Sequence, residues 1–116
     1  MGQVVALMDD LFFQMKLAET AKHLGLQVKV AANYDALAPL LEAAPKLLIV
    51  DLNSRSEPVA TIARIRAANN PVPIVAFLSH VQTELARQAE TAGCDEVLPR
   101  SVFTKNLSEI LARAKD

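Results

Sequence analysis

The sequence predicts an α/β domain with a doubly wound, five-stranded parallel sheet and helices on both faces. Short apolar runs of strand length alternate along the chain with longer stretches whose apolar residues recur at helical spacing. Five such strand–helix units joined by right-handed crossovers build a parallel sheet, because each helix packs back onto a face of it. The 116 residues contain no internal repeat or linker, so we expect residues 1–116 to form a single domain.

The strands are expected at the short apolar runs. The first run reads as a buried strand, whereas in the second Leu26, Val28 and Val30 alternate with polar residues. A segment rich in Asn and Pro, which interrupts regular secondary structure, precedes the fourth run. The predicted strands are residues 3–8, 26–31, 46–50, 74–78 and 96–98.

The helices are expected between residues that favour helix ends. Gly25 and Gly93 are natural residues just past the first and fourth helices. Asn33 is a natural N-cap for the second, and Pro58 suits the first turn of the third. The predicted helices are residues 11–24, 34–44, 58 to about 68, 83–92 and 104–115.

The first helix is predicted from the apolar residues Phe12, Met15, Ala18 and Ala21/Leu24, which recur at helical spacing. Phe13 is adjacent to Phe12, and neighbouring helical positions cannot face the core equally. At least one of these two phenylalanines is therefore expected at the surface or in an interface.

The composition excludes several classes of protein. The net charge of −1 gives no sign of a surface that binds nucleic acid or a membrane. No run of about 18 apolar residues and no signal-peptide pattern is present. The single cysteine, Cys94, excludes an internal disulfide and a cysteine-based zinc site. We expect a soluble, cytoplasmic protein.

Three carboxylates carry the strongest chemical signal in the chain. Asp9 and Asp10 follow the first predicted strand, and Asp51 follows the third. Sites in open α/β sheets form outside the carboxyl ends of the strands, so these side chains are expected to converge. Negative charges at such short separations require a hard cation or a basic side chain between them.

The order of these motifs resembles that of a response-regulator receiver domain, the CheY-like family with a flavodoxin-like (βα)5 fold. The resemblance covers the whole chain and implies the strand order 2-1-3-4-5. It also implies that Asp51 is the phosphoacceptor. By the same resemblance, Mg²⁺ would be held by Asp9, Asp10, Asp51 and the backbone carbonyl of Asn53. The segments that carry it are residues 8–10, 49–53, 72–75 and 92–96.

Two departures from the family concern the switch inside the domain. The hydroxyl residue at the end of the fourth strand corresponds to Leu78, which has no donor. Ser79 lies one residue further on and would become an anion contact if the register slipped. The aromatic residue in the fifth strand corresponds to Val97, so both positions of the coupled pair are aliphatic.

Two further departures follow the fifth strand. The family's lysine corresponds to Arg100, whose planar guanidinium could pair with Asp51 and fill the space of a metal or phosphate, or could point to solvent. The proline that follows in the family corresponds to Ser101. A cis peptide bond without proline costs roughly 3–4 kcal/mol, so a trans bond and a differently shaped loop are expected.

These residues favour a receiver-like signalling module of the two-component type, a pseudo-receiver with a degraded phosphorylation switch that acts through protein–protein interaction. The alternative is a working Mg²⁺-dependent phosphoacceptor at Asp51 in a phosphorelay. Either would bind a histidine kinase, a phosphotransfer protein or a signalling target, as a monomer or weak homodimer. A flavodoxin-like cofactor binder is less favoured, because no glycine forms a phosphate-cradling loop after the first strand. No nucleophile–base pair indicates an enzyme.

Overall fold

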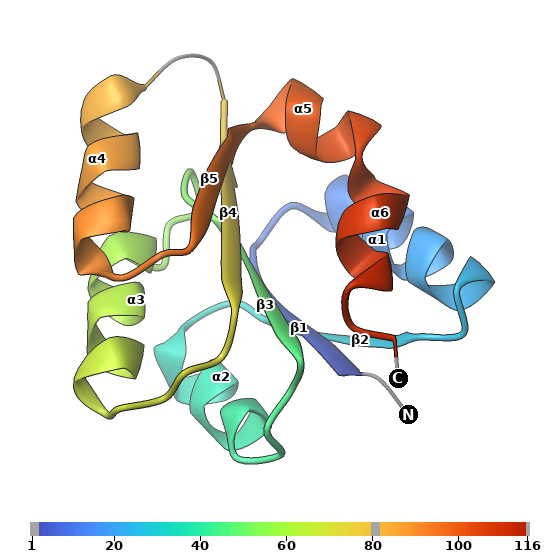
Figure 1. The fold of residues 1–116 in the computed structure, drawn as a ribbon, viewed down its shortest axis with the longest axis horizontal. Coiled ribbons are helices and arrows are strands. Elements are labelled where there is room, and N and C mark those ends of the chain that lie inside the picture. Colours follow the sequence, from blue (N-terminus) through green and yellow to red (C-terminus); the bar gives the residue numbers. More distant parts are fainter. Residues whose placement is uncertain (1–2, 80–81, 116) are drawn as a thin grey trace.

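In the computed structural model, which describes residues 3–79 and 82–115, a five-stranded sheet lies between two layers of helices (Figure 1). Every strand pair is parallel, and the order is β2-β1-β3-β4-β5. The predicted fold class and strand order are confirmed. The strands are β1 (Gln3–Leu7), β2 (Gln27–Ala31), β3 (Leu47–Asp51), β4 (Ile74–Leu78) and β5 (Glu96–Pro99). The helices are α1 (Leu11–His23), α2 (Tyr34–Leu41), α3 (Pro58–Ala67), α4 (Thr83–Ala92), α5 (Arg100–Lys105) and α6 (Leu107–Ala112).

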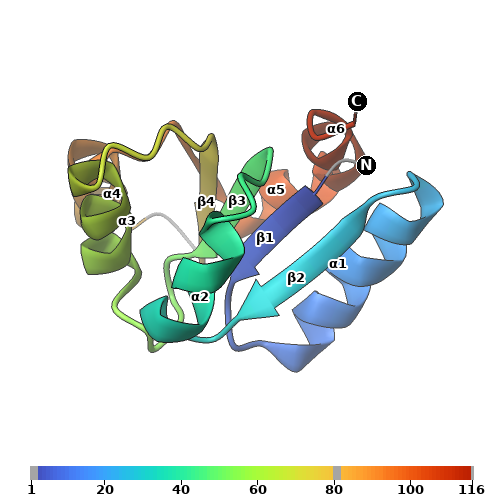
Figure 2. The same cartoon turned by 90° about the horizontal axis from the view of Figure 1, so that it is seen from below.

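The two faces of the sheet carry separate apolar cores. Helices α1, α5 and α6 cover one face, and α2, α3 and α4 cover the other (Figures 1 and 2). Successive β4 residues alternate between these cores, so Phe77 packs toward α1 and Leu78 toward α4. Burial on both faces explains why the β1, β3 and β4 sequences are almost continuously apolar.

The residues whose spacing predicted α1 do not share one buried face, because Ala21 is buried but Phe12 and Met15 are not. Phe12 is 86% exposed and Met15 is 70% exposed, whereas Phe13 and Leu17 are buried. The phase of the helix is set at its first turn, where Asp10 is the N-cap and accepts a hydrogen bond from the Phe13 amide. That the two adjacent phenylalanines cannot both be buried is confirmed.

Phe13 belongs to an aromatic cluster that explains why it, rather than Phe12, is buried. Its ring centroid lies 5.0 Å from that of Phe77 in β4 and 5.9 Å from that of Phe103 in α5. Phe77 and Phe103 stack with centroids 4.7 Å apart. Such pairs add about 0.5–1.5 kcal/mol each beyond their buried area. The cluster fixes α1 and α5 at the same edge of the sheet.

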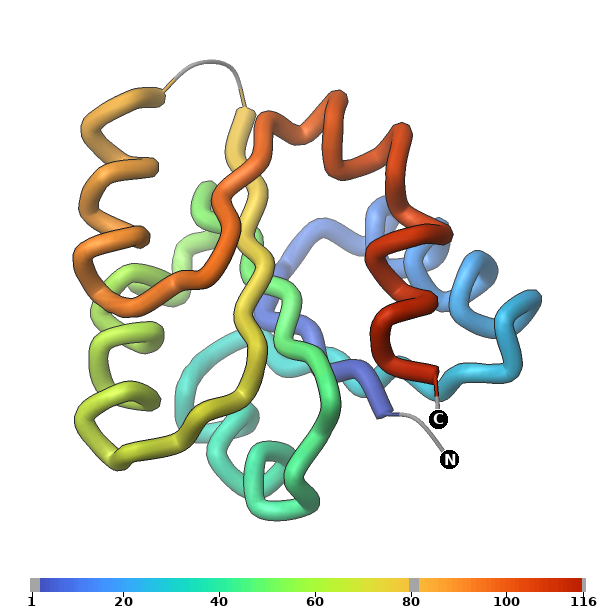
Figure 3. Tube along the Cα trace, viewed as in Figure 1, coloured from blue at the N-terminus to red at the C-terminus, as the bar shows by residue number. Residues whose placement is uncertain are grey.

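The predicted last helix at residues 104–115 is wrong in its start. Helix α5 begins at Arg100, directly after β5, and Asn106 separates it from α6, as the bend in Figure 3 shows. Pro99 has no amide hydrogen to continue the strand ladder, and Phe103 is buried within the following helical turn. No described peptide bond is cis, as expected for Ser101, which lies in α5.

Among the described helices, none is long and apolar enough to cross a membrane.

Candidate functional site

The predicted acidic site lies at the carboxyl ends of β1 and β3. These strands are direct neighbours, with Leu7 opposite Val50, so the chain segments that follow them start side by side. Asp51 is the last residue of β3, while Asp9 and Asp10 form the connection from β1 to α1. The strand order thus accounts for the convergence that the sequence predicted.

Asp10 is fully engaged by the protein. Its Oδ1 accepts a hydrogen bond from the Phe13 amide at 3.1 Å, and its Oδ2 accepts one from Nη2 of Arg100 at 2.8 Å. The Arg100 hydrogen bond, helped by the Phe13 amide, holds the pKa of the Asp10 carboxyl below its usual value. Asp10 therefore stays ionised as a helix cap and as the partner of Arg100.

Arg100 is held in the site by its flat faces as well as by its charge. The guanidinium carbon lies 4.7 Å from the Phe13 ring centroid and 5.6 Å from that of Phe77. The side chain is only 35% exposed, so this contact is more than a surface ion pair. Of the two positions expected for Arg100, the site is the one observed. Its partner is Asp10, however, and not Asp51.

Asp51 is the most buried carboxylate described, with 4% of its surface exposed. Its Oδ1 accepts a hydrogen bond from the Asn53 amide at 2.9 Å. Burial raises the pKa of the Asp51 carboxyl, and the nearby charges of Asp9 and Asp10 add to this, while the Asn53 bond and Arg100 oppose it. Asp51 is thus a carboxylate whose charge is only partly compensated.

The oxygen donors at the site suit Mg²⁺ in kind, because carboxylate and carbonyl oxygens are the ligands that this ion prefers. The hydrogen bonds that these oxygens already accept from the protein work against the binding of the ion. One Asp10 oxygen is committed to Arg100, and Asp9 Oδ2 accepts the Arg55 amide at 3.2 Å. Within residues 3–79 and 82–115, no group of three or more His, Cys, Asp or Glu side chains is arranged to hold a metal ion. Asp9, Asp10, Asp51 and the Asn53 carbonyl as metal ligands, and Asp51 as phosphoacceptor, stay predictions.

The side chain of Asn53 links the acidic site to the end of β4, a role that the sequence reasoning missed. Its Oδ1 accepts a hydrogen bond from the Ser79 amide at 2.6 Å, and its Nδ2 donates to Gln82 Oε1 at 2.9 Å. Only the backbone carbonyl of Asn53 was considered from the sequence. A carboxamide two residues after a strand-end aspartate is a signal that could have drawn attention to the side chain.

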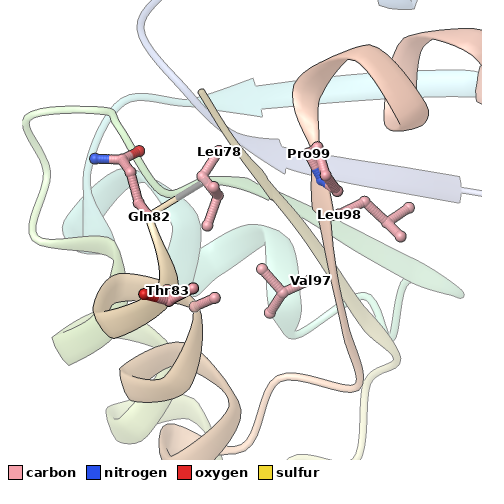
Figure 4. A pocket seen from close by; sticks show the side chains of 7 residues that line it. Leu78, Gln82, Thr83, Val97, Leu98 and Pro99 are labelled. Carbon is pink, nitrogen blue, oxygen red and sulfur yellow. The ribbon is translucent and has the colours of Figure 1, made fainter. Parts of the chain in front are cut away.

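The altered switch positions Leu78 and Val97 point into one pocket between β4, β5 and the start of α4 (Figure 4). Its volume is about 120 Å³, and Gln82 and Thr83 supply its polar edge. The pairing of β4 with β5 puts Leu78 opposite Pro99 and Ala76 opposite Val97. No hydroxyl stands at the end of β4 itself. Ser79 is half-buried and presents its amide to Asn53, so its role as an anion contact stays a prediction. His80, which follows Ser79 and which the sequence predicts to be a loop residue, lies outside the described residues.

Comparison with known proteins identifies the fold. No family model and no curated protein matches the sequence. The chemotaxis response regulator CheY4 of Vibrio cholerae superposes with a TM-score of 0.82 at 21% identity, over 99% of both chains. A CheY-like receiver domain protein from Methanospirillum hungatei gives 0.82 at 16% identity, over 96% of this chain and 90% of that one. NtrX from Brucella abortus gives 0.81 at 20% identity, and the match covers 98% of this chain but 27% of NtrX.

The chain has the receiver fold. The resemblance drawn from the sequence is thereby supported for the whole of the described chain. In this fold the acidic pair follows β1, Asp51 ends β3 and Arg100 follows β5.

The Asp51→Asn variant is expected to be more stable than the wild type at neutral pH, by about 1–2 kcal/mol. An amide keeps the shape and the acceptor for the Asn53 amide, and it removes a charge whose burial is costly. Because the folded-state pKa of Asp51 is raised above the unfolded value, the wild type regains stability as the pH falls through that pKa. The advantage of the variant should therefore shrink on acidification.

Urea unfolding at pH 7 and near pH 4 measures this difference. The matched control is Asp35→Asn, at an exposed position on α2, where a change within about 0.5 kcal/mol is expected at both pH values. A less stable Asp51→Asn variant at pH 7 would contradict the assignment of an undercompensated charge.

Proposed function

We propose that the chain is a signalling module of the two-component type whose phosphorylation switch is degraded and which acts by binding a partner protein. The observation that carries this proposal is the ion pair between Arg100 and Asp10. It places a fixed positive charge inside the acidic site, where the guanidinium also packs over the Phe13 and Phe77 rings. The repulsion among the carboxylates is thus relieved by the protein itself.

Mg²⁺ would have to be held by Asp9, Asp10, Asp51 and the Asn53 carbonyl, and when bound it would offset the charge of a phosphoryl group. Arg100 competes for one of these ligands. Asp51 is also 4% exposed, so a phosphoryl donor would have to reach a buried acceptor. Phosphorylation is therefore disfavoured in this arrangement at both the metal and the acceptor.

The readout of the switch is disfavoured as well. Leu78 and Val97 meet in an apolar pocket and have no polar alternative to exchange. A signal would then be carried by which partner the surface binds rather than by a phosphoryl group. We expect that partner to be a histidine kinase, a phosphotransfer protein or a signalling target, and the setting to be cytoplasmic.

The apolar surface at the start of α1 supports a protein partner. Leu11, Phe12 and Met15 are the most exposed large apolar side chains described, and they lie next to Asp10 at the edge of the acidic site. Exposed apolar side chains that cluster in this way are typical of interaction surfaces. Phe12→Ser should leave stability within about 0.5 kcal/mol and weaken partner binding.

A second candidate function is a Mg²⁺-dependent phosphoacceptor in a phosphorelay. The observation in its favour is that, among the described residues, the one hydrogen bond to the Asp51 carboxylate is the Asn53 amide on Oδ1. No hydrogen bond to Asp51 Oδ2 is seen among the described residues, so in this function Oδ2 would be the oxygen that accepts the phosphoryl group. In this function Arg100 would have to leave Asp10 when the ion binds.

An amide NMR titration with millimolar Mg²⁺, followed by beryllofluoride as a mimic of the phosphoryl group, separates the two functions. The proposal predicts no chemical-shift change at Asp9, Asp51 or Asn53 with either addition. Changes that spread from these residues to Val97 and α4 would establish the phosphoacceptor instead. Changes with Mg²⁺ alone, confined to the acidic site, would mean a metal site without a switch and would refute the exclusion of the ion by Arg100.

A further inference from the structure

The carboxamide of Asn53 joins three parts of the chain that are far apart in sequence. Its own backbone amide binds the Asp51 carboxylate at 2.9 Å. Its side chain accepts the Ser79 amide at 2.6 Å and donates to Gln82 at 2.9 Å. The acidic site is therefore connected by consecutive hydrogen bonds to both ends of the segment between β4 and α4.

Gln82 lies at the far end of this chain of hydrogen bonds. It is the N-cap residue of α4, although it makes no capping hydrogen bond with its side chain. The same side chain borders the apolar pocket that Leu78 and Val97 line (Figure 4). The orientation of the Gln82 side chain thus affects the mouth of the pocket, next to the residue at which α4 begins.

We propose that Asn53 is a positioning residue that couples the acidic site to the pocket between α4 and β5, by holding Gln82 and the Ser79 amide in place. The inference rests on the proposed function, since it assigns a regulatory connection to that same site. It supplies a polar route between Asp51 and the α4 surface in a chain whose Leu78 and Val97 offer none. A displacement of the Asn53 amide at Asp51 moves the carboxamide, and the carboxamide moves Gln82.

The strength of this connection follows from where its bonds lie. The Asn53 and Gln82 side chains are exposed, so water can replace each of these hydrogen bonds at little cost to the fold. Loss of the carboxamide should therefore leave the fold intact and change local structure. Backbone unfolding is not needed for the effect, which makes a spectroscopic measurement the appropriate one.

The test compares Asn53→Ala with Gln82→Ala in the free protein, without Mg²⁺, beryllofluoride or a partner, by methyl and amide NMR. Asn53→Ala should shift the Val97 and Ala86 methyl resonances and the Ser79 amide. Gln82→Ala should reproduce the methyl shifts while changing the Ser79 amide far less. The double variant should add little to Asn53→Ala, because both substitutions break one connected path.

The matched control is Asn106→Ala, which removes a carboxamide bond to the Val102 carbonyl outside this path and should leave Val97 and Ala86 unmoved. Wild-type methyl shifts in both the Asn53 and the Gln82 variants would overturn the inference. Additive shifts in the double variant would also overturn it, since independent effects need no coupling. Neither result would affect the proposed function, which the Mg²⁺ and beryllofluoride titration tests on the wild-type chain.

Discussion

Replacing Arg100 by alanine is expected to open the acidic site to Mg²⁺ and to raise the affinity for the ion about tenfold or more. The substitution releases Asp10 Oδ2 from the guanidinium at 2.8 Å and removes the only side-chain cation seen to pair with the three carboxylates in the described chain. Asp9, Asp10 and Asp51 would then repel one another without relief, which is the condition that favours a divalent cation. A tenfold change corresponds to about 1.4 kcal/mol, a modest demand on an ion pair whose side chains are 35% and 34% exposed.

The same variant should lose about 1–2 kcal/mol of stability in the absence of the ion, because the cation–π contact with Phe13 disappears with the ion pair. Added Mg²⁺ should restore part of this loss in Arg100→Ala and none of it in the wild type. Calorimetric titration and thermal unfolding with and without the ion measure both effects.

Two further variants separate charge from shape. Arg100→Lys keeps the charge and loses the planar stacking, so it should still exclude Mg²⁺ better than alanine does. Arg113→Ala breaks a more exposed pair with Glu96 and should change neither stability by more than about 0.5 kcal/mol nor the affinity for the ion. If Arg100→Ala bound Mg²⁺ no better than the wild type, the ion pair could not be what closes the site.

The convergence of the aspartates was predictable because it depends on strand order alone. Once Asp10 and Asp51 are assigned to the ends of neighbouring parallel strands, the sheet brings them together whatever the side chains do. The bounds of β4 and α4 were likewise fixed by strong local signals, a purely apolar run and the Gly93 stop. Such features need no knowledge of packing.

The partner of Arg100 was not predictable, because a long side chain can reach several carboxylates from one backbone position. What selects Asp10 is the pair of rings beneath the guanidinium, from Phe13 and Phe77, and these come from two other elements. The same limit applies to α1. Phe12, Met15 and Ala18 recur at helical spacing just as Phe13, Leu17 and Ala21 do, so spacing alone could not choose the buried face.

Arg66 holds together the chain segments that lead into β4 and β5, at the opposite end of these strands from the acidic site. Arg66→Ala is expected to destabilise the fold by about 2–3 kcal/mol. The Arg66 guanidinium donates to the carbonyls of Asn70, Val72 and Gly93 at 2.7–2.9 Å and pairs with Asp95 at 3.0 Å. Asp95 also accepts a hydrogen bond from the Ile74 amide, so the segments that enter β4 and β5 are joined by one set of polar contacts around Arg66. We call this set the Arg66 clasp. Charge-assisted bonds to several carbonyls are worth more than one surface ion pair.

Gly93 provides an internal check on this clasp. A Cβ added at Gly93 would lie 2.4 Å from Arg66 Cγ, and the φ of +119° disfavours any other residue. Gly93→Ala should therefore cost more in the wild type than in the Arg66→Ala background, where the clash is gone and only the backbone strain remains. Urea unfolding of the four proteins of this cycle measures the difference. Additive costs would mean that Arg66 moves aside freely, and the clasp would then contribute far less than its four hydrogen bonds suggest.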